Sequence, residues 1–271
     1  MGVSPPAALA PAPGSWELTV RSLRCWIVVY RRTWRSSIWS SFLGPLLYLG
    51  AMGFGLGSLV DSHGTAALGG VSYLRFLAPA ILAIQAMQTA VGESTYPVFG
   101  SVKWNKIYIA AQASPLRPAD IYRGHLLFNT LRIAMNSAVF LIVMAAFGAA
   151  RSPEVVLGLP AATLLGLAFA APIGAWAVTV KEGSSFNYVF RFGMMPLMLF
   201  SATFFPLSRL PGWLLPVAYA TPLWQGVALC RGLSLGTLTA SAAAIHVGYL
   251  AALSALGIWA GGRTYRRRLY V

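Results

Sequence analysis

Long uncharged stretches alternate with short basic segments along most of this chain. The stretch between Arg35 and Asp61 contains 25 uncharged residues, and the one between Arg75 and Glu93 contains 17. About 20 apolar residues in a helix cross the roughly 30 Å hydrocarbon core of a bilayer. The pattern therefore predicts an all-α integral membrane protein with six transmembrane helices. These six predicted spans are residues 37–60, 74–92, 124–148, 155–180, 187–206 and 238–262.

A seventh apolar stretch, at about 210–230, follows the fifth predicted span. It is interrupted by Pro211, Pro216 and Pro222. Proline removes a backbone donor and breaks a helix interior, so this stretch cannot cross the membrane as one straight helix. We expect two short apolar helices there instead, at about 211–219 and 222–233.

The distribution of Lys and Arg predicts the topology. Fifteen of these residues lie in the N-terminal segment, the loop after the second span and the other segments on the same side, against four on the opposite side. Such a bias marks the cytoplasmic side. We expect a multi-pass protein of the bacterial inner membrane with both termini in the cytoplasm. Residues 1–14 are rich in Pro and Ala and are expected to form a disordered leader.

Residues 15–36 combine five arginines with Trp and aliphatic residues before the first predicted span. Aromatic rings at headgroup depth and arginines near anionic lipid are typical of an amphipathic helix lying in the membrane interface. We therefore divide the chain into a leader (1–14), an interfacial helix (15–36) and a six-span domain (37–271). A short basic tail before the membrane is the alternative for the second segment.

The composition agrees with a membrane protein, because 57% of the residues are hydrophobic and only 10% are charged. The net charge of +14 would suggest nucleic acid in a soluble protein, but here the basic residues separate apolar spans, and no nucleic-acid partner is expected. The two cysteines are far apart in sequence, which excludes a disulfide framework.

The sequence lacks the motifs expected for ATP binding, metal binding, ion coupling and catalysis. There is no GxxxxGK[ST] phosphate loop, so any ATP hydrolysis requires a separate chain. The three histidines lie in different segments without partner ligands, and no metal site is expected. No acidic residue lies well inside a predicted span, which argues against an ion-coupled carrier. No catalytic residues are predicted, since a membrane enzyme acting on lipid-linked sugars would need grouped acids or a His and Asp pair.

The longest cytoplasmic connection, at 93–120, is too polar for the membrane and too apolar for a free linker. A helix at about 98–112, ended by Pro115 and Pro118, would place Trp104 and Tyr108 on one face. This segment is expected either to dock a cytoplasmic partner or to rest on the membrane surface.

The third predicted span carries a polar stripe. Its residues His125, Asn129, Arg132 and Asn136 follow helical spacing, so they share one face. Polar groups at this depth should face the bundle or a cavity rather than lipid. Arg132 is expected either to pair with Glu93 or to bind an anionic head group.

Glycines recur in the first predicted span. Gly53 and Gly57 have the spacing that allows two helices to approach closely. Either a dimer seam or packing within the chain would explain them.

Two motifs make the sequence recognisable. The loop containing ESTYP, KWNKIY and SPLRPADIYRG, and the later run FSATFFPLSRLPGWLLPVAYATPLWQGVALCRG, resemble those of ABC-2 type export permeases. The branch that they resemble includes lipooligosaccharide and nodulation-factor exporters and, more distantly, daunorubicin-resistance permeases.

The resemblance implies a permease that forms a homodimer or a paralogous heterodimer, with two separate ATPase subunits that bind ATP and Mg. No cofactor is expected in this chain, and membrane lipid is its further partner. The family's cytoplasmic coupling helix would correspond to the loop after the second span, and its extracellular re-entrant hairpin to the proline-broken stretch. The implied coupling residues are Tyr96, Trp104, Asn105, Tyr108 and Pro115. The residues at the implied extracellular gate are Phe205, Pro206, Pro211, Trp213, Pro222 and Trp224.

The function that we expect is export of an amphipathic substrate, such as a lipid-linked glycan, lipooligosaccharide or glycolipid. The polar stripe would line its path, with Glu93 as the charge partner. Efflux of a hydrophobic drug or antibiotic is the alternative within the family.

Overall fold

The computed structural model describes residues 14–65, 68, 70–150, 152–207 and 210–269. Helices dominate these ranges, and no strand occurs in them. The predicted all-α fold is therefore confirmed. Residues 1–13, which make up almost all of the predicted leader, lie outside the described residues.

Five segments of the described chain are long and apolar enough to cross a bilayer. They are Leu43–Ser62, Tyr73–Lys103, Pro118–Ala146, Pro153–Ala177 and Ala240–Leu269. Each overlaps one of the predicted spans, and together they support an integral membrane protein.

The predicted span at 187–206 has no counterpart among these five segments. The chain forms η4 (Gly183–Ser185), α8 (Phe186–Tyr188), the π-helix η5 (Val189–Met194) and α9 (Met195–Phe200) there. Ala202, just after α9, has a positive φ of 56°, which ends the helical path. The helical part is therefore shorter than the span that we predicted.

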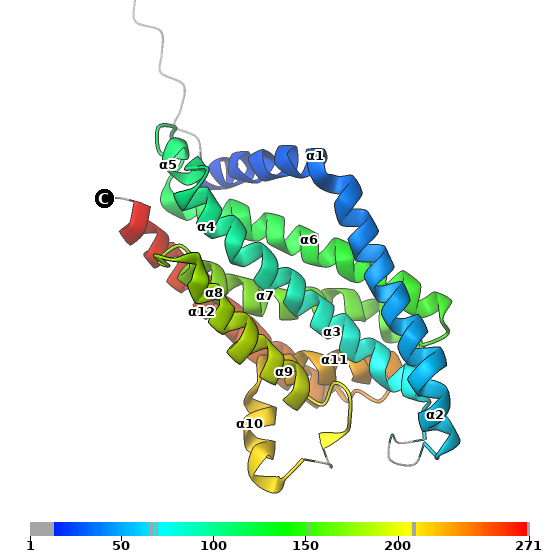
Figure 1. Ribbon diagram of the computed structural model, residues 1–271. Helices are drawn as coiled ribbons and strands as arrows, with labels where there is room; N and C mark the ends of the chain where they lie inside the picture. The colour runs from blue at the N-terminus through cyan, green and yellow to red at the C-terminus, as the bar shows by residue number, and fades with distance from the viewer. Residues whose placement is uncertain (1–13, 66–67, 69, 151, 208–209, 270–271) are drawn as a thin grey trace, which may run out of the picture.

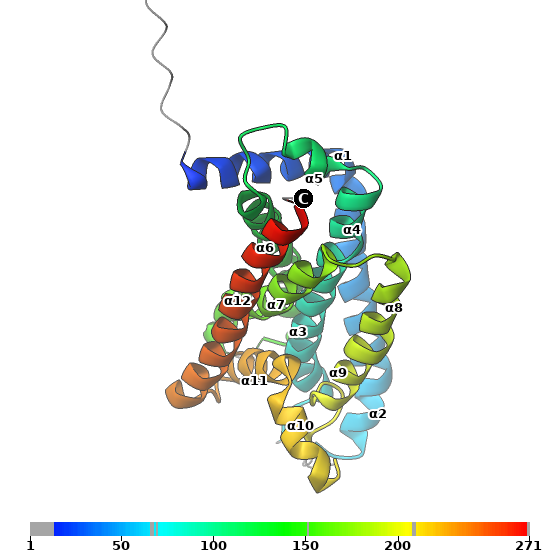
Figure 2. The ribbon, with the colours of Figure 1, turned by 90° about the vertical axis from the view of Figure 1, so that its left-hand side faces the viewer.

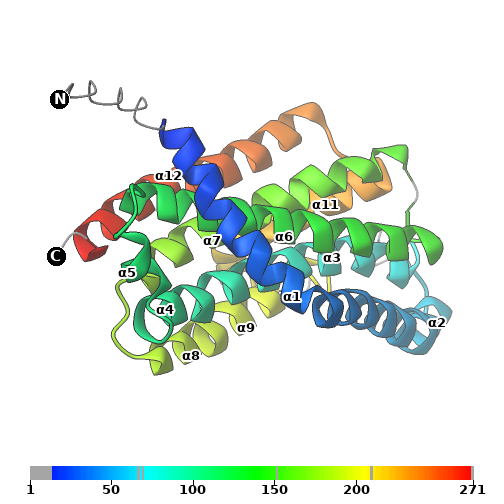
Figure 3. The same ribbon diagram turned by 90° about the horizontal axis from the view of Figure 1, so that it is seen from above.

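The first helix, α1 (Ser15–Gly50), includes both the predicted interfacial segment and the start of the first predicted span. It bends within its length, and its first half lies across α6 (Pro118–Ala146) (Figures 1 and 3). A Cβ at Gly124 of α6 would lie 2.4 Å from Ser22 Oγ, so only glycine allows this close crossing. The Trp26 and Phe128 rings stack beside it, 5.7 Å apart.

Beyond α1 the chain continues through the π-helix η1 (Ala51–Leu56) into α2 (Gly57–Ser62). Gly53 lies in this π-helix, whereas Gly57 is the first residue of α2. A Cβ at Gly53 would contact the Leu74 side chain, whereas one at Gly57 would meet the backbone oxygen of Met52. Of the two explanations that we left open, packing within the chain therefore accounts for Gly53, whose close neighbour is Leu74 in the helix that follows.

The centre of the bundle is α3 (Tyr73–Ser94), which packs against α6, α7 (Gly158–Ala177) and α11 (Pro222–Leu235) (Figures 1 and 2). Its side chains are mostly buried, among them Leu77 and Met87. Several alanines along α3 allow the neighbouring helices to approach closely, as small residues do in membrane bundles. The short helix η3 (Pro153–Leu157) leads into α7.

Tyr122 of α6 joins three helices. Its hydroxyl lies within hydrogen-bond distance of two carbonyl oxygens, Ala171 O of α7 at 2.9 Å and Gly257 O of α12 (Ala240–Leu269) at 3.2 Å. A Cβ at Gly261 would lie 2.1 Å from Tyr122 Cζ. Gly261 therefore makes room for the Tyr122 ring, whereas Gly257, four residues earlier, makes room for Pro172 and Ala171 of α7.

The two ends of the bundle differ. The start of α1, α5 (Ile107–Ala111), the start of α6 and the end of α12 gather at one end, whereas α2 and α10 (Leu215–Ala220) lie at the other (Figures 1 and 2). The first end carries Arg117, Arg123 and Arg266, and we call it the basic end. The turn η7 (Gly212–Leu214) precedes α10.

Candidate functional site

The polar stripe of α6 faces the C-terminal half of α3. Asn129 Nδ2 donates to Ser94 Oγ at 2.8 Å, and Asn136 Nδ2 donates to Thr89 Oγ1 at 3.1 Å. Helical spacing accounts for this common direction, and these two hydrogen bonds offset part of the cost of burying the two amides.

Arg132 forms an ion pair with Glu93, one of the two pairings that the sequence left open. Arg132 Nη2 lies 3.0 Å from Glu93 Oε1, and Nε donates to the same oxygen at 3.1 Å. The side chains are 12% and 23% exposed, so the pair is largely removed from solvent. The guanidinium also lies over the Tyr30 ring of α1, 4.5 Å from its centroid. Arg132 therefore connects α1, α3 and α6.

A polar cavity of about 360 Å³ opens beside this pair. It is lined by Gln85, Gln88, Thr89, Gly92, Glu93, Pro97, Arg132 and Asn136. Within the described part of the chain, Arg132 Nη1 is buried and has no hydrogen-bond partner. The arrangement presents amide groups and one partly compensated positive charge, which suits a polar or anionic group of a ligand.

His125 is buried between α3, α5 and α1. Its Nε2 lies 3.1 Å from the backbone oxygen of Glu93, which can only accept a hydrogen bond. Nε2 therefore carries the hydrogen, and Nδ1 accepts from the Tyr108 hydroxyl. The Trp26 ring covers His125, with centroids 4.2 Å apart. His125 belongs to the predicted stripe but does not line the polar cavity. It connects α1, α3 and α5 near the basic end instead.

The predicted helix at 98–112 is interrupted. The structure has α4 (Tyr96–Lys103), then a break at 104–106, then α5. Lys106 adopts a left-handed conformation with φ of 50°, while Trp104 N and Asn105 N both donate to Gly100 O. Such a chain reversal ends α4 in the way that αL residues end many helices.

The break changes which of the predicted coupling residues are accessible. Trp104 is 64% exposed, and Asn105 and Pro115 are exposed as well. Tyr108 is 1% exposed, and burial raises the pKa of its phenol, which remains a neutral donor. Our expectation that Tyr108 offers an accessible ring to a partner was wrong, because the turn at Lys106 directs α5 onto α6 and α12.

A second hollow, of about 360 Å³, lies between α1 and the segment from α4 to α5. The residues that line it are Cys25, Trp26, Val29, Tyr96, Pro97, Gly100, Ser101, Trp104, Asn105 and Ile107. The structure thus brings Tyr96, Trp104 and Asn105 together at one surface, while Pro115 lies in the loop after α5 and does not line it. We call this hollow the α1–α4 groove.

The residues predicted for the extracellular gate lie at the end opposite the basic end. Thr221 caps α11, because its Oγ1 accepts from Trp224 N at 3.2 Å, and Pro222 occupies the first turn. The Trp224 ring packs edge-on against Tyr219 of α10. Trp213 is 75% exposed, Pro211 is exposed and Phe205 and Pro206 are half-buried, so these four do not form one site with Trp224.

Arg231 of α11 is a residue that sequence reasoning did not select. Its Nε donates to Phe76 O of α3 at 3.1 Å, and its Nη2 donates to Ala202 O at 2.8 Å. It therefore fixes the left-handed turn after α9 to the bundle centre. The sequence feature that could have pointed to Arg231 is its position after a proline-broken apolar stretch, because a charged side chain there needs hydrogen-bond partners or water.

Comparison with known proteins gives a consistent result. The family model described as ABC-2 type transporter matches residues 17–234. Nodulation protein J of Rhizobium leguminosarum bv. trifolii is 31% identical over 254 residues, which cover 90% of this chain and 94% of that protein. Nodulation protein J of Rhizobium meliloti is 28% identical over 267 residues, covering 94% and 99% respectively. That of Bradyrhizobium diazoefficiens is 30% identical over 260 residues, covering 90% and 94%.

Proposed function

The chain belongs to the ABC-2 type transporter family, and on this basis we propose that it is the transmembrane subunit of an ATP-driven exporter. The single observation that carries the proposal is the match of the family model to residues 17–234. The substrate that we propose is an amphipathic lipooligosaccharide or a related lipid-linked glycan. The relatives' shared name refers to nodulation, and the resemblance of the two sequence motifs implies this substrate class.

Energy would come from two ATP-binding cassette subunits, which bind ATP and Mg and dock at the basic end. The α1–α4 groove supports this assignment because it combines an exposed Trp104 with a hollow lined by two different elements. Exposed aromatic rings beside a hollow are common anchors of protein interfaces. Tyr96, Trp104 and Asn105 would contact the ATPase directly. Tyr108 would not contact it, but would fix the position of α5 through its packing against His125 and Tyr265.

For the topology we propose six spans, with both termini in the cytoplasm and α10 with α11 as the re-entrant hairpin outside. The segment from α8 to α9 would cross as the fifth span despite its length. Exposed apolar side chains there, such as Phe192 and Met195, support contact with lipid or with a second permease chain. The exposed Leu43 and Leu47 of α1 support the same arrangement.

The substrate path that we propose passes the polar cavity beside Arg132. An anionic head group would compete with Glu93 for the guanidinium, because Arg132 and Glu93 both line this cavity. Asn129 and Asn136 would hold α3 and α6 in register next to the passing group.

The function is tested with purified chain reconstituted in proteoliposomes with its ATPase. Lipooligosaccharide should move only when ATP and Mg are present, and the permease alone should hydrolyse no ATP. A hydrophobic drug that moves while the lipooligosaccharide does not would shift the assignment to drug efflux. ATP turnover by the clean permease would contradict the subunit role.

Replacing Trp104 by alanine should weaken ATPase binding at least tenfold, or about 1.4 kcal/mol, because it removes an exposed aromatic anchor. Binding is measured by titrating labelled ATPase onto permease in nanodiscs. Trp213→Ala is the matched control, since Trp213 is similarly exposed but lies at the other end of the bundle. Equal affinities for both variants would show that the α1–α4 groove does not bind the ATPase.

A further inference from the structure

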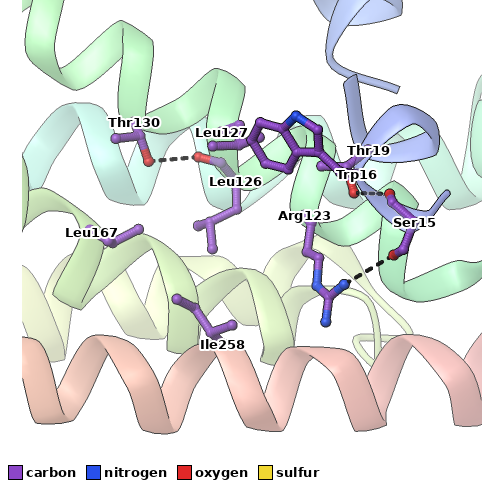
Figure 4. A pocket seen from close by; sticks show the side chains of 9 residues that line it. All are labelled: Ser15, Trp16, Thr19, Arg123, Leu126, Leu127, Thr130, Leu167 and Ile258. Atoms are coloured by element: carbon purple, nitrogen blue, oxygen red, sulfur yellow. Dashed lines mark hydrogen bonds between the residues drawn. The ribbon is translucent and has the colours of Figure 1, made fainter. Parts of the chain in front are cut away.

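Two adjoining hollows meet at Arg123, at the basic end of the bundle. The first, of about 430 Å³, is bounded by α1, α6, α7 and α12, and Figure 4 shows its lining side chains. The second, also of about 430 Å³, lies at the start of α6 and the end of α12. Ser15 and Arg123 line both hollows, so the two are continuous at these side chains.

The first hollow is mostly apolar, and its polar lining residues are Ser15, Thr19, Arg123 and Thr130. Leu126, Leu127, Leu167 and Ile258 form its wall, and Trp16 extends over it from α1 (Figure 4). The leucines and Ile258 belong to segments that are apolar enough to lie in a membrane. An apolar hollow at that depth excludes water and favours a hydrocarbon chain.

The second hollow is strongly basic. Its charged side chains are Arg117, Arg123 and Arg266, against the single carboxylate of Asp120. Neither ion pair found among the described residues includes any of these three arginines. Guanidinium groups in such a cluster match the oxygens of a phosphate diester, which they can bind through two parallel hydrogen bonds.

Asp120 offsets one of these three positive charges, and it also positions the residues around it. Its Oδ1 accepts from Ser15 Oγ at 2.7 Å, and Ser15 Oγ in turn accepts from Arg123 Nη1 at 3.3 Å. The start of α1 is thereby fixed beside Arg123, whose guanidinium points along the hollow toward α12 (Figure 4). The remaining donors of Arg123 stay available for a ligand.

We propose that the two hollows together bind one anionic glycerophospholipid of the surrounding leaflet, which fastens the first half of α1 to α6 and α12. Its phosphate contacts Arg123, Arg117 and Arg266, and one acyl chain fills the apolar hollow. Charge complementarity selects an anionic head group, and the continuity of the two hollows selects a lipid over a free anion.

This site is separate from the polar cavity beside Arg132. Arg123 and Arg132 are nine residues apart on α6, which is about two and a half turns, so they point to opposite sides of the helix. The transported molecule and the bound phospholipid therefore contact different faces of α6, and the occupant of this site is a resident lipid rather than cargo.

The test uses the full chain in phosphatidylcholine nanodiscs, to which phosphatidylglycerol is added. We expect phosphatidylglycerol to bind at one molecule per chain, detected by native mass spectrometry, and to raise the unfolding temperature. The double variant Arg123→Gln with Arg266→Gln should bind it at least tenfold more weakly. Arg267→Gln, an exposed arginine at the same end of α12 that lines neither hollow, should bind like wild type.

Further arms distinguish the possible occupants. Leu127→Phe fills the apolar hollow and should weaken phosphatidylglycerol binding while leaving the arginines in place. Equal binding by the wild type and the double variant would overturn the proposal. The proposal would also be overturned if inorganic phosphate raised the unfolding temperature as much as the lipid does. Displacement of phosphatidylglycerol from the site by a lipooligosaccharide would overturn it as well.

Discussion

Replacing Arg132 by alanine is expected to lower the free energy of unfolding of the permease by about 3 kcal/mol, since breaking a buried ion pair costs roughly 3 to 5 kcal/mol. The variant leaves the Glu93 carboxylate without its partner in a site where both side chains are largely buried. It also removes the guanidinium from the Tyr30 ring, which loosens α1. We place the loss at the lower end of the range because water in the adjoining cavity can solvate Glu93 in part.

The measurement is the unfolding free energy of each variant in the same nanodiscs, together with its transport rate. Arg21→Ala is the matched control, because Arg21 pairs with Glu17 at 2.6 Å on the exposed side of α1. Such a surface pair contributes about 0.5 kcal/mol or less. The exchange Arg132→Glu with Glu93→Arg should recover part of the loss. A stable Arg132→Ala protein that no longer transports would instead show that Arg132 serves the substrate and not the fold.

Replacing Gly261 by alanine is expected to destabilise the permease by about 2 kcal/mol. The new methyl group would overlap the Tyr122 ring, which hydrogen bonds to Ala171 O and Gly257 O and cannot move without losing these contacts. Overpacking a tight contact typically costs about 1 to 3 kcal/mol, which exceeds the gain of up to about 1 kcal/mol from replacing glycine in a helix.

Gly262→Ala provides the matched control for this prediction. A Cβ at Gly262 meets no atom within 4 Å, so this variant gains helix propensity without a clash and should be slightly more stable. The two neighbouring variants should thus change the unfolding free energy in opposite directions. Similar stabilities for both would mean that α12 packs differently against Tyr122.

Among the features of the site, the polar contacts between α3 and α6 could be predicted best from the sequence. Helical spacing placed Asn129, Arg132 and Asn136 on one face, and the cost of exposing them to lipid required that this face turn inward. The depth of Arg132 then left few acids within reach, and Glu93 was among them. Periodicity and the cost of burying charge were sufficient for this step.

The region after α3 was not predictable in the same way. A continuous helix at 98–112 fits the local pattern, yet Lys106 adopts a left-handed conformation and Tyr108 is buried. Lysine has no preference for that conformation, so the turn follows from packing of Tyr108 against His125 and Tyr265. Contacts between residues far apart in sequence cause the break between α4 and α5, and such contacts cannot be predicted from the local sequence pattern.

Arg231 illustrates a related limit. It was counted only among the four basic residues on the side opposite the cytoplasm, but its partners are the backbone carbonyls of Phe76 and Ala202. Carbonyl groups are present at every residue and carry no sequence signal. The segment from α8 to α9 ends earlier than predicted for the same reason. The turn at Ala202 is held by the hydrogen bond from Arg231 to Ala202 O, and the sequence gives no sign of this contact.

The hydroxyl of Tyr122 is one of the contacts that fix the rotational register of α12. Each residue of an α-helix advances the side-chain direction by about 100°, so a slip of one position would turn the whole basic end of α12. Gly257 O, bound by Tyr122, lies about two and a half turns before Arg266. A Tyr122→Phe variant keeps the ring but loses this fixed point, and the direction in which Arg266 presents its positive charge then depends on packing and on the hydrogen bond from Gln112 Nε2 to Leu269 O.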